Sequence, residues 1–391
     1  MGFWSGLAQI VIVPIVVLAV VLTTVPVWIW LERRVCARIQ QRIGPNRVGY
    51  QGILQPLADA AKLLFKEDIT PLHVDRMIYL LAPALALAPS IAALAVIPFS
   101  PLLQVADINL GVLLILALSS LAVYGVVLAG WSSNNKWSLM GGIRSAAQMV
   151  SYELGMGLAI IAVILTSSAF AAHSGGQFAA LSLRTAVESQ RGPAFLCWNC
   201  IWQLPAFAIF LVAAVAESNR APFDLPEAEQ ELVAGFHTEY SSFRFAMFYM
   251  GEYVHMTLLS SVCTCLFLGG WLSPFGGIKW LSSLNVSHVP VLMYLAPLFW
   301  FFLKVTLFIF LYIWLRWTMP RMRWDQLMRL GWIVLLPAGL AWVTVVAVLQ
   351  GFGNELGGFI FGPVGWYRLA VLVLAGVGWL LWSRRRVAEA V

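Results

Sequence analysis

Long apolar segments alternate with short polar segments along most of the chain. A transmembrane helix needs about 20 consecutive apolar residues, and these segments reach that length without the alternation over about 10 residues that marks a membrane β-strand. The pattern therefore predicts an all-α polytopic membrane protein with about nine transmembrane helices. They are expected at 7–30, 77–99, 110–130, 146–170, 197–216, 246–271, 290–315, 329–350 and 365–382.

The composition agrees with this class. The chain has 391 residues, of which 61% are hydrophobic and 11% are charged, whereas a soluble domain is about half apolar and a quarter charged. We expect a single membrane domain over residues 1–391. The first apolar stretch lacks a basic region before it and is longer than a signal-peptide core, so it is predicted to be a retained span.

The positions of Lys and Arg predict an orientation, because loops on the inner side of a membrane carry an excess of both. With the N-terminus outside, inner loops contain 19 of the 24 basic residues and outer loops contain 4, while Lys304 lies inside a span. We therefore expect an N-out/C-in chain. The net charge of +6 then belongs mostly to the inner membrane face, and it does not indicate nucleic-acid binding.

The first inner loop, 32–76, contains a second kind of helix. Apolar residues recur at steps of three and four between Ile53 and Phe65, and Asp59, Lys62 and Lys66 fall on the opposite face. This spacing predicts an amphipathic helix that is too short to span and lies at the membrane surface. Such a helix either contributes to a functional site or only anchors the loop at the membrane, and the spacing of its apolar residues fits both.

An acidic inner loop, 217–245, interrupts the apolar sequence. A carboxylate near lipid costs about 2.5–3.5 kcal/mol, so groups of this kind usually serve protons, ions or polar ligands. Crowding and burial both favour the neutral form of a carboxylate, which suits proton exchange; the alternative is a loop whose acids only face water. Seven of the 18 acidic residues lie between 217 and 252, namely Glu217, Asp224, Glu227, Glu229, Glu231, Glu239 and Glu252.

Three ionisable residues fall within predicted spans: Glu153, Glu252 and Lys304. Charges inside a membrane usually line a polar pathway. A second possibility is an ion pair, either Glu153–Lys304 or Glu252–Lys304, that fixes two helices together.

No metal or covalent cofactor is expected. Cys197 and Cys200 have CxxC spacing, but a metal site would need a second such pair or paired histidines nearby. The two cysteines are either incidental or a labile disulfide. No glycine-rich phosphate-binding loop occurs in the sequence.

Four long motifs resemble one family closely: the H-type, or subunit 1 type, of membrane subunit in respiratory complex I, the proton-pumping NADH:quinone oxidoreductase. The resemblance runs in consistent order from residue 1 to about 350. The extra C-terminal helix and basic tail at 365–391 depart from many members, and the loop at 172–196 has no counterpart that we can map. The motifs are ERRVCARIQQRIGPNRVGYQGILQPLADAAKLLFKED, WSSNNKWSLMGGIRSAAQMVSYE, AESNRAPFDLPEAEQELVAGFHTEY and WLRWTMPRMRWDQLM.

The resemblance implies a role in coupling. A subunit of this type forms part of the quinone chamber, has no catalytic residue of its own, and links quinone reduction to proton pumping. The residues that match the chamber wall are Glu32, Arg33, Arg34, Arg42, Arg47, Asp59, Glu217, Arg220, Asp224, Glu227, Glu229 and Glu231. The expected proton path uses Glu153, Glu217, Glu252 and Lys304.

The resemblance also implies partners. Quinone is the expected substrate, and FMN and Fe–S clusters are expected on partner subunits. Those partners are the quinone-site and Fe–S subunits of the peripheral arm, small membrane subunits and antiporter-like subunits, all in a bacterial inner (plasma) membrane or else a mitochondrial inner membrane. Two alternatives stay open: a homologous scaffold subunit of a membrane-bound hydrogenase or formate-linked complex, and a stand-alone proton-coupled transporter.

Overall fold

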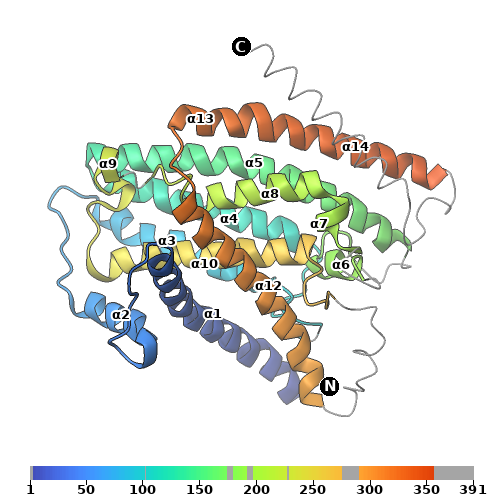
Figure 1. Cartoon of the computed structure of the whole chain (residues 1–391), viewed down its shortest axis with the longest axis horizontal. Coiled ribbons are helices and arrows are strands. Elements are labelled where there is room, and N and C mark those ends of the chain that lie inside the picture. The colour runs from blue at the N-terminus through green and yellow to red at the C-terminus, as the bar shows by residue number, and fades with distance from the viewer. Residues whose placement is uncertain are drawn as a thin grey trace.

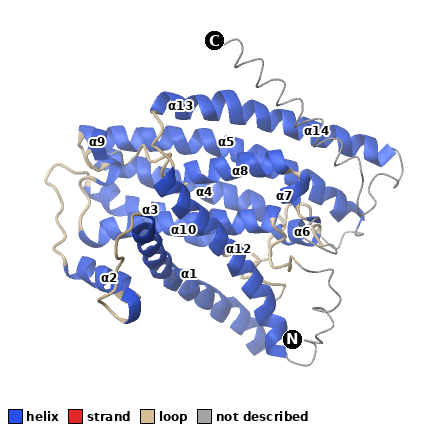
Figure 2. Ribbon diagram, viewed as in Figure 1, coloured by secondary structure: helices blue, strands red, loops and turns tan. Residues whose placement is uncertain are grey.

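The protein is built from helices wherever the structure describes it (Figures 1 and 2). The computed structural model describes residues 3–101, 103–173, 179–191, 197–226, 229–274 and 290–355. The helix and tail predicted at 365–391 lie outside these residues, as does part of the 172–196 loop. No strand occurs in the described ranges, so the predicted all-α class is confirmed.

Each of the first eight predicted spans overlaps at least one helix. Six helical segments are long and apolar enough to cross a bilayer, and α8 is a shorter apolar helix. The count of nine and the N-out/C-in orientation stay predictions. The helices are α1 (Phe3–Ile39), α2 (Gln55–Phe65), α3 (Arg76–Leu94), α4 (Gly111–Ser132), α5 (Lys136–His173), α6 (Leu183–Glu188), α7 (Asn199–Trp202), α8 (Leu204–Glu217), α9 (Glu229–Leu232), α10 (Ser242–Phe267), α12 (Pro290–Thr318), α13 (Trp324–Arg329) and α14 (Leu336–Glu355).

Proline explains why one predicted span is shorter than expected. The apolar run at 197–216 was predicted as a single helix, but α8 begins only at Leu204, with Pro205 in its first turn. Proline fits the first turn of a helix and breaks a helix interior, because it lacks an N–H group and its ring clashes with the preceding turn. Residues 199–202 therefore form the separate turn α7.

The long helices α3, α4, α5, α8 and α10 pack side by side, α14 lies along α5, and α1 and α12 contact one another and α10 (Figure 1). Helix α10 is the most enclosed, since every residue from Tyr253 to Phe267 is buried. Its interior hydroxyl groups donate to carbonyls of the preceding turn, as Ser260 does to Met256 at 2.7 Å. Polar side chains are thereby satisfied within an apolar helix.

Glycine allows the closest helix contact. A Cβ atom on Gly125 of α4 would lie 2.4 Å from the backbone nitrogen of Ala86 on α3. Small residues let backbones approach where lipid supplies no hydrophobic drive for helix association.

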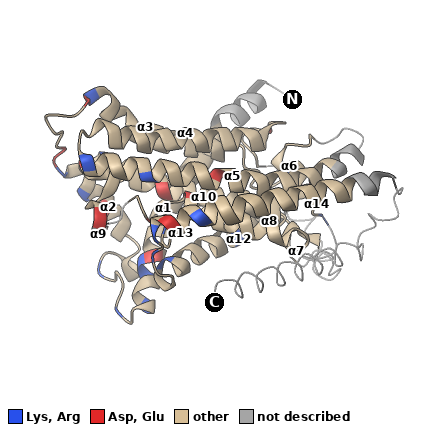
Figure 3. Cartoon of the chain, turned by 90° about the horizontal axis from the view of Figure 1, so that it is seen from above, with Lys and Arg blue, Asp and Glu red and all other residues tan. Residues whose placement is uncertain are grey.

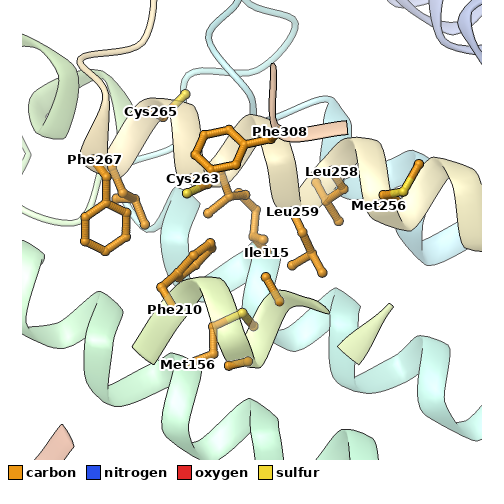
Figure 4. Close-up of a cluster of buried hydrophobic side chains, with 14 of the residues drawn as sticks. Ile115, Met156, Phe210, Met256, Leu258, Leu259, Cys263, Cys265, Phe267 and Phe308 are labelled. Carbon is orange, nitrogen blue, oxygen red and sulfur yellow. The ribbon is translucent and has the colours of Figure 1, made fainter. Parts of the chain in front are cut away.

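The apolar centre of the bundle lies between α8, α10 and α12. Phe210, Cys263, Phe267 and Phe308 gather there (Figure 4). All five cysteines are free thiols, so the possible Cys197–Cys200 disulfide is not formed.

Candidate functional site

A buried carboxylate joins four parts of the chain. Glu32 of α1 is 6% exposed and accepts hydrogen bonds from Arg220, at 3.1 Å to each carboxylate oxygen, and from the hydroxyl of Tyr253, at 2.7 Å. Arg316 of α12 also donates to it. We call these four residues the Glu32 network; it connects α1, the loop after α8, α10 and α12.

Arg220 is the central cation of this network. Its guanidinium lies 4.3 Å from the ring centroid of Tyr253 and 4.0 Å from the carboxylate of Glu252. Burial alone would lower the pKa of Arg220, but the electrostatic influence of Tyr253, Glu32 and Glu252 outweighs burial and raises it well above the usual value. The guanidinium therefore stays charged.

The Glu32 network borders a pocket of about 340 Å³, within the usual size range of small-molecule sites. Its lining combines carboxylate, guanidinium and phenol groups, so it can take a ring-containing ligand with polar oxygens. The residues that line it are Glu32, Arg33, Cys36, Ala37, Arg42, Ile43, Gly44, Pro45, Tyr249, Tyr253, Arg316 and Trp317.

The first loop supplies one wall of this pocket. Helix α2 occupies the segment where an amphipathic helix was predicted, and its Asp59 pairs with Arg33 of α1 at 2.5 Å. Arg34 lies over the ring of Trp30 and donates to the carbonyl of Gln51 at 3.0 Å. Of the predicted arginines, Arg33 and Arg42 line the pocket.

Arg47 is exposed in the same loop and is not among the pocket-lining residues.

The acidic loop is less crowded than its sequence indicates. Asp224 pairs with Arg321 at 2.9 Å, Glu231 with Arg144 at 2.7 Å, and Glu239 accepts from Asn135 at 2.6 Å. Cations and an amide from other elements thus organise the described part of this loop. Glu227 and the side chain of Glu229 lie outside the described residues.

A second buried group lies deeper in the bundle. Glu217 ends α8 and is 3% exposed; its Oε1 is 3.4 Å from Nε2 of His255 on α10. Glu153 of α5 accepts hydrogen bonds from Ser119, at 3.3 Å, and Ser120 of α4. It also interacts electrostatically with both Glu217 and His255.

The sequence pattern did not lead us to predict His255 as a functional residue. The signal that could have found it is its position three residues after Glu252, one turn further along a helix that is apolar on all sides. A helix of that kind is buried, so a histidine in its middle is buried as well.

Lys304 lies apart from the acids. Its Nζ donates to the carbonyls of Leu268, Gly270 and Leu272 at 2.7, 2.8 and 2.6 Å, and it lies 4.1 Å from the ring centroid of Trp198. Leu268 is about 20 Å beyond His255 along α10, at 1.5 Å per residue. The Glu153–Lys304 and Glu252–Lys304 ion pairs, kept open above, are therefore wrong.

Charge is unevenly distributed over the bundle. Most described Lys, Arg, Asp and Glu residues gather toward the end that carries α2, α9 and α13, whereas the end near α6 and α7 is mostly uncharged (Figure 3). Lys304 lies toward the uncharged end, since its Nζ is 4.1 Å from the ring centroid of Trp198, the residue before α7.

Comparison with known proteins connects this arrangement to one family. The family model for NADH dehydrogenase matches residues 11–347. The H 2 subunit of the NADH-quinone oxidoreductase of Koribacter versatilis is 46% identical over 355 residues, which cover 85% of this chain and 94% of that protein. The H subunit of the same enzyme from Rickettsia canadensis is 48% identical over 348 residues, which cover 88% and 95%.

A third relative, subunit 8 of the NADH-quinone oxidoreductase of Rhodothermus marinus, is 47% identical over 347 residues, which cover 88% of this chain and 97% of that protein. These relatives do not favour the hydrogenase-type or transporter alternatives. The chain belongs to the NADH dehydrogenase family, in the group of H-type subunits of NADH-quinone oxidoreductase, which correspond to subunit 1 of complex I.

Proposed function

We propose that this chain is the membrane subunit of a proton-translocating NADH:quinone oxidoreductase that forms part of the quinone chamber and couples quinone reduction to proton movement. One observation carries the proposal: the Glu32 network lies at the wall of the pocket and reaches α1, α10 and α12 from there. A change of charge in the pocket acts on three long helices at once through these contacts.

The chamber role rests on the pocket lining. Arg33, Arg42 and Arg316 offer guanidinium donors, and Tyr249 and Tyr253 offer phenol groups. A quinone headgroup has two carbonyl oxygens that accept hydrogen bonds and a ring that packs on aromatic side chains. Reduction adds negative charge to those oxygens, which the neighbouring guanidinium groups stabilise.

Residues of the Glu32 network are close in the chain to two of the deeper acids. Arg220 follows Glu217 by three residues at the end of α8, and Tyr253 of the network is the neighbour of Glu252 on α10. A movement of Arg220 or of α10 therefore changes the surroundings of Glu217 and Glu252, and Glu217 in turn interacts electrostatically with Glu153. The proposed proton path uses these three carboxylates.

The energy scale is suitable for this mechanism. Moving one proton against 100 mV costs about 2.3 kcal/mol, and one pKa unit corresponds to about 1.36 kcal/mol. Modest changes of pKa at two or three coupled carboxylates therefore supply enough free energy to move one proton.

Lys304, predicted as a fourth member of the path, has a different environment. Carbonyl oxygens accept hydrogen bonds but are far too weakly basic to take a proton, and three of them surround its ammonium group. We therefore propose that Lys304 anchors the segment after α10 to α12 and does not carry protons.

Partners and location complete the proposal. We assign quinone to this chain as substrate and no cofactor; FMN and the Fe–S clusters belong to subunits of the peripheral arm. Small membrane subunits and antiporter-like subunits continue the membrane arm. The relatives named above favour a bacterial inner (plasma) membrane over a mitochondrial inner membrane.

Purification of a tagged chain from its native membrane tests this function. We expect the other subunits to co-purify, with NADH:quinone activity coupled to proton translocation. Hydrogenase or formate-linked activity without NADH:quinone activity would overturn the proposal in favour of a related complex. Substrate uptake by the isolated, reconstituted chain, driven by a proton gradient, would overturn it in favour of a transporter.

A further inference from the structure

The imidazole of His255 is buried, and both of its nitrogens lack a hydrogen-bond partner among the described residues. The residue is 6% exposed. Oε2 of Glu217 also lacks a hydrogen-bond partner within the same described ranges. Buried polar groups are normally hydrogen-bonded, and each exception costs about 1–3 kcal/mol, so an exception calls for a reason.

Ionisable groups surround the Glu217–His255 pair from α5, α10 and α12. Glu217 of α8 is 3.4 Å away, and Glu153 of α5 interacts with it electrostatically. Tyr312 of α12 interacts with Glu217, and Glu252 precedes His255 by one turn of α10. Helix α3, which also packs on α10, has no ionisable side chain between 80 and 94.

Burial determines how many protons this pair contains. A net charge inside an apolar bundle is costly, whereas an ion pair and a neutral pair both have zero net charge. Glu217 and His255 therefore favour one shared proton over none or two. The proton lies either on the carboxyl group or on the imidazole, and neighbouring charges decide which.

We propose that Glu217 and His255 share one proton, and that His255 carries charge between the Arg220 side of the bundle and Glu153. In this step an O–H bond of the Glu217 carboxyl group breaks and an N–H bond forms at Nε2 of His255, which gives carboxylate and imidazolium. An ionised Glu153 stabilises the imidazolium of His255 by charge attraction. Protonation of Glu153 removes that stabilisation. The inference rests on the proposed function and adds a histidine to its path of carboxylates.

The geometry suits a switch better than a permanent pair. At 3.4 Å the two atoms are slightly beyond the usual range for a hydrogen bond between N–H and O. Histidine is also the side chain whose charge changes nearest to neutral pH.

Substitution of His255 in the complete enzyme complex tests the inference. His255→Asn keeps a polar side chain of smaller size but cannot ionise, and His255→Gln is the second variant if Asn reduces assembly. Thr257→Val is the matched control, because Thr257 lies on the same buried helix and donates only to the carbonyl of Tyr253 on that helix, at 2.8 Å. Rates are normalised to NADH:ferricyanide activity, which needs no quinone site.

We expect His255→Asn to lower quinone-linked turnover about tenfold, below the 10²–10⁴-fold of a direct proton-transfer group, because Glu217 also interacts directly with Glu153. The apparent pKa of the pH–rate profile should move, and Thr257→Val should change neither quantity. In a Glu217→Gln background, His255→Asn should cause no further loss, because the two residues act as one unit.

Normal turnover with an unchanged pH profile in both His255 variants would overturn the inference, as would losses that multiply in the double variant. A wild-type complex that lacks NADH:quinone activity would instead overturn the proposed function, so the two failures are distinguishable.

Discussion

The Glu32 network and the Glu217–His255 pair are both buried, yet they differ in how completely their charges are matched. Glu32 has two guanidinium partners and a phenol, and guanidinium groups do not lose their protons in proteins. Within the described residues, the ion-pair contact of Glu217 is with a histidine, whose charge can change. The first group therefore holds fixed charges, whereas the second has the chemistry to change its own charge.

The exposed ion pairs are a third class, which differs from the two buried groups in its contact with water. Arg144–Glu231 and Arg33–Asp59 join helices through side chains that are between 25% and 61% exposed. Ion pairs in contact with water are worth about 0–1 kcal/mol, whereas removing one partner of a buried pair costs about 3–5 kcal/mol. Substitutions in the three classes should therefore have graded effects.

The largest effect is expected for Glu32→Ala. The change leaves the buried Arg220 and the half-buried Arg316 without their carboxylate, which should destabilise the fold by about 3–5 kcal/mol. Thermal unfolding of the purified complex and the yield of assembled complex measure the loss. Asp59→Ala, which breaks the exposed pair with Arg33, is the control, and equal losses in both variants would contradict the distinction.

Glu217→Gln should cut quinone-linked turnover about tenfold to a hundredfold while ferricyanide reduction by NADH stays intact. The amide keeps the shape of the side chain but cannot release a proton to His255. Steady-state rates with a quinone and with ferricyanide measure the two activities. Equal loss of both would instead point to failed assembly, whereas normal quinone-linked turnover would remove Glu217 from the path.

Lys304→Met should leave three carbonyls without their donor and should destabilise the complex by about 1–3 kcal/mol. The number of protons translocated per electron should stay unchanged, because in our proposal Lys304 only anchors the segment after α10. A lowered proton stoichiometry in stable, assembled complex would instead return Lys304 to the proton path.

Glu153→Gln or Glu252→Gln should reduce quinone-linked turnover and proton translocation together, each by about fivefold, a value at the low end of coupling energies between sites. Reconstituted vesicles with a pH-sensitive dye report both quantities in one preparation. A variant with the normal rate and the normal proton stoichiometry would exclude that residue from the path.

Glu231→Gln should have the smallest effect. Its carboxylate pairs with Arg144 at 2.7 Å but is 61% exposed, so stability should change by less than about 1 kcal/mol. A large loss of turnover would show that this part of the acidic loop contacts the chamber directly, as the sequence resemblance implied.

Local sequence patterns predict the helices well and the contacts between them poorly. The length of the apolar runs predicts the spans, and an amphipathic pattern predicts the helix at 53–66. Arg220 lies three residues after Glu217 and four before Asp224, so closeness in the chain alone would pair it with these acids. In the structure Arg220 binds Glu32, 188 residues away, and Asp224 binds Arg321.

The apolar runs alone predict the helical class of this protein and the approximate position of each long helix that the structure describes. The reason is that a chain in lipid must satisfy its backbone hydrogen bonds internally, so a run of about 20 apolar residues has few other conformations. Which charges meet depends instead on how the helices pack in three dimensions. Glu32 and Arg316 are 284 residues apart, and the facing of two helices depends on the packing of all their neighbours. The meeting of His255 with Glu217 follows from that packing, and no local pattern in α10 or α8 encodes it.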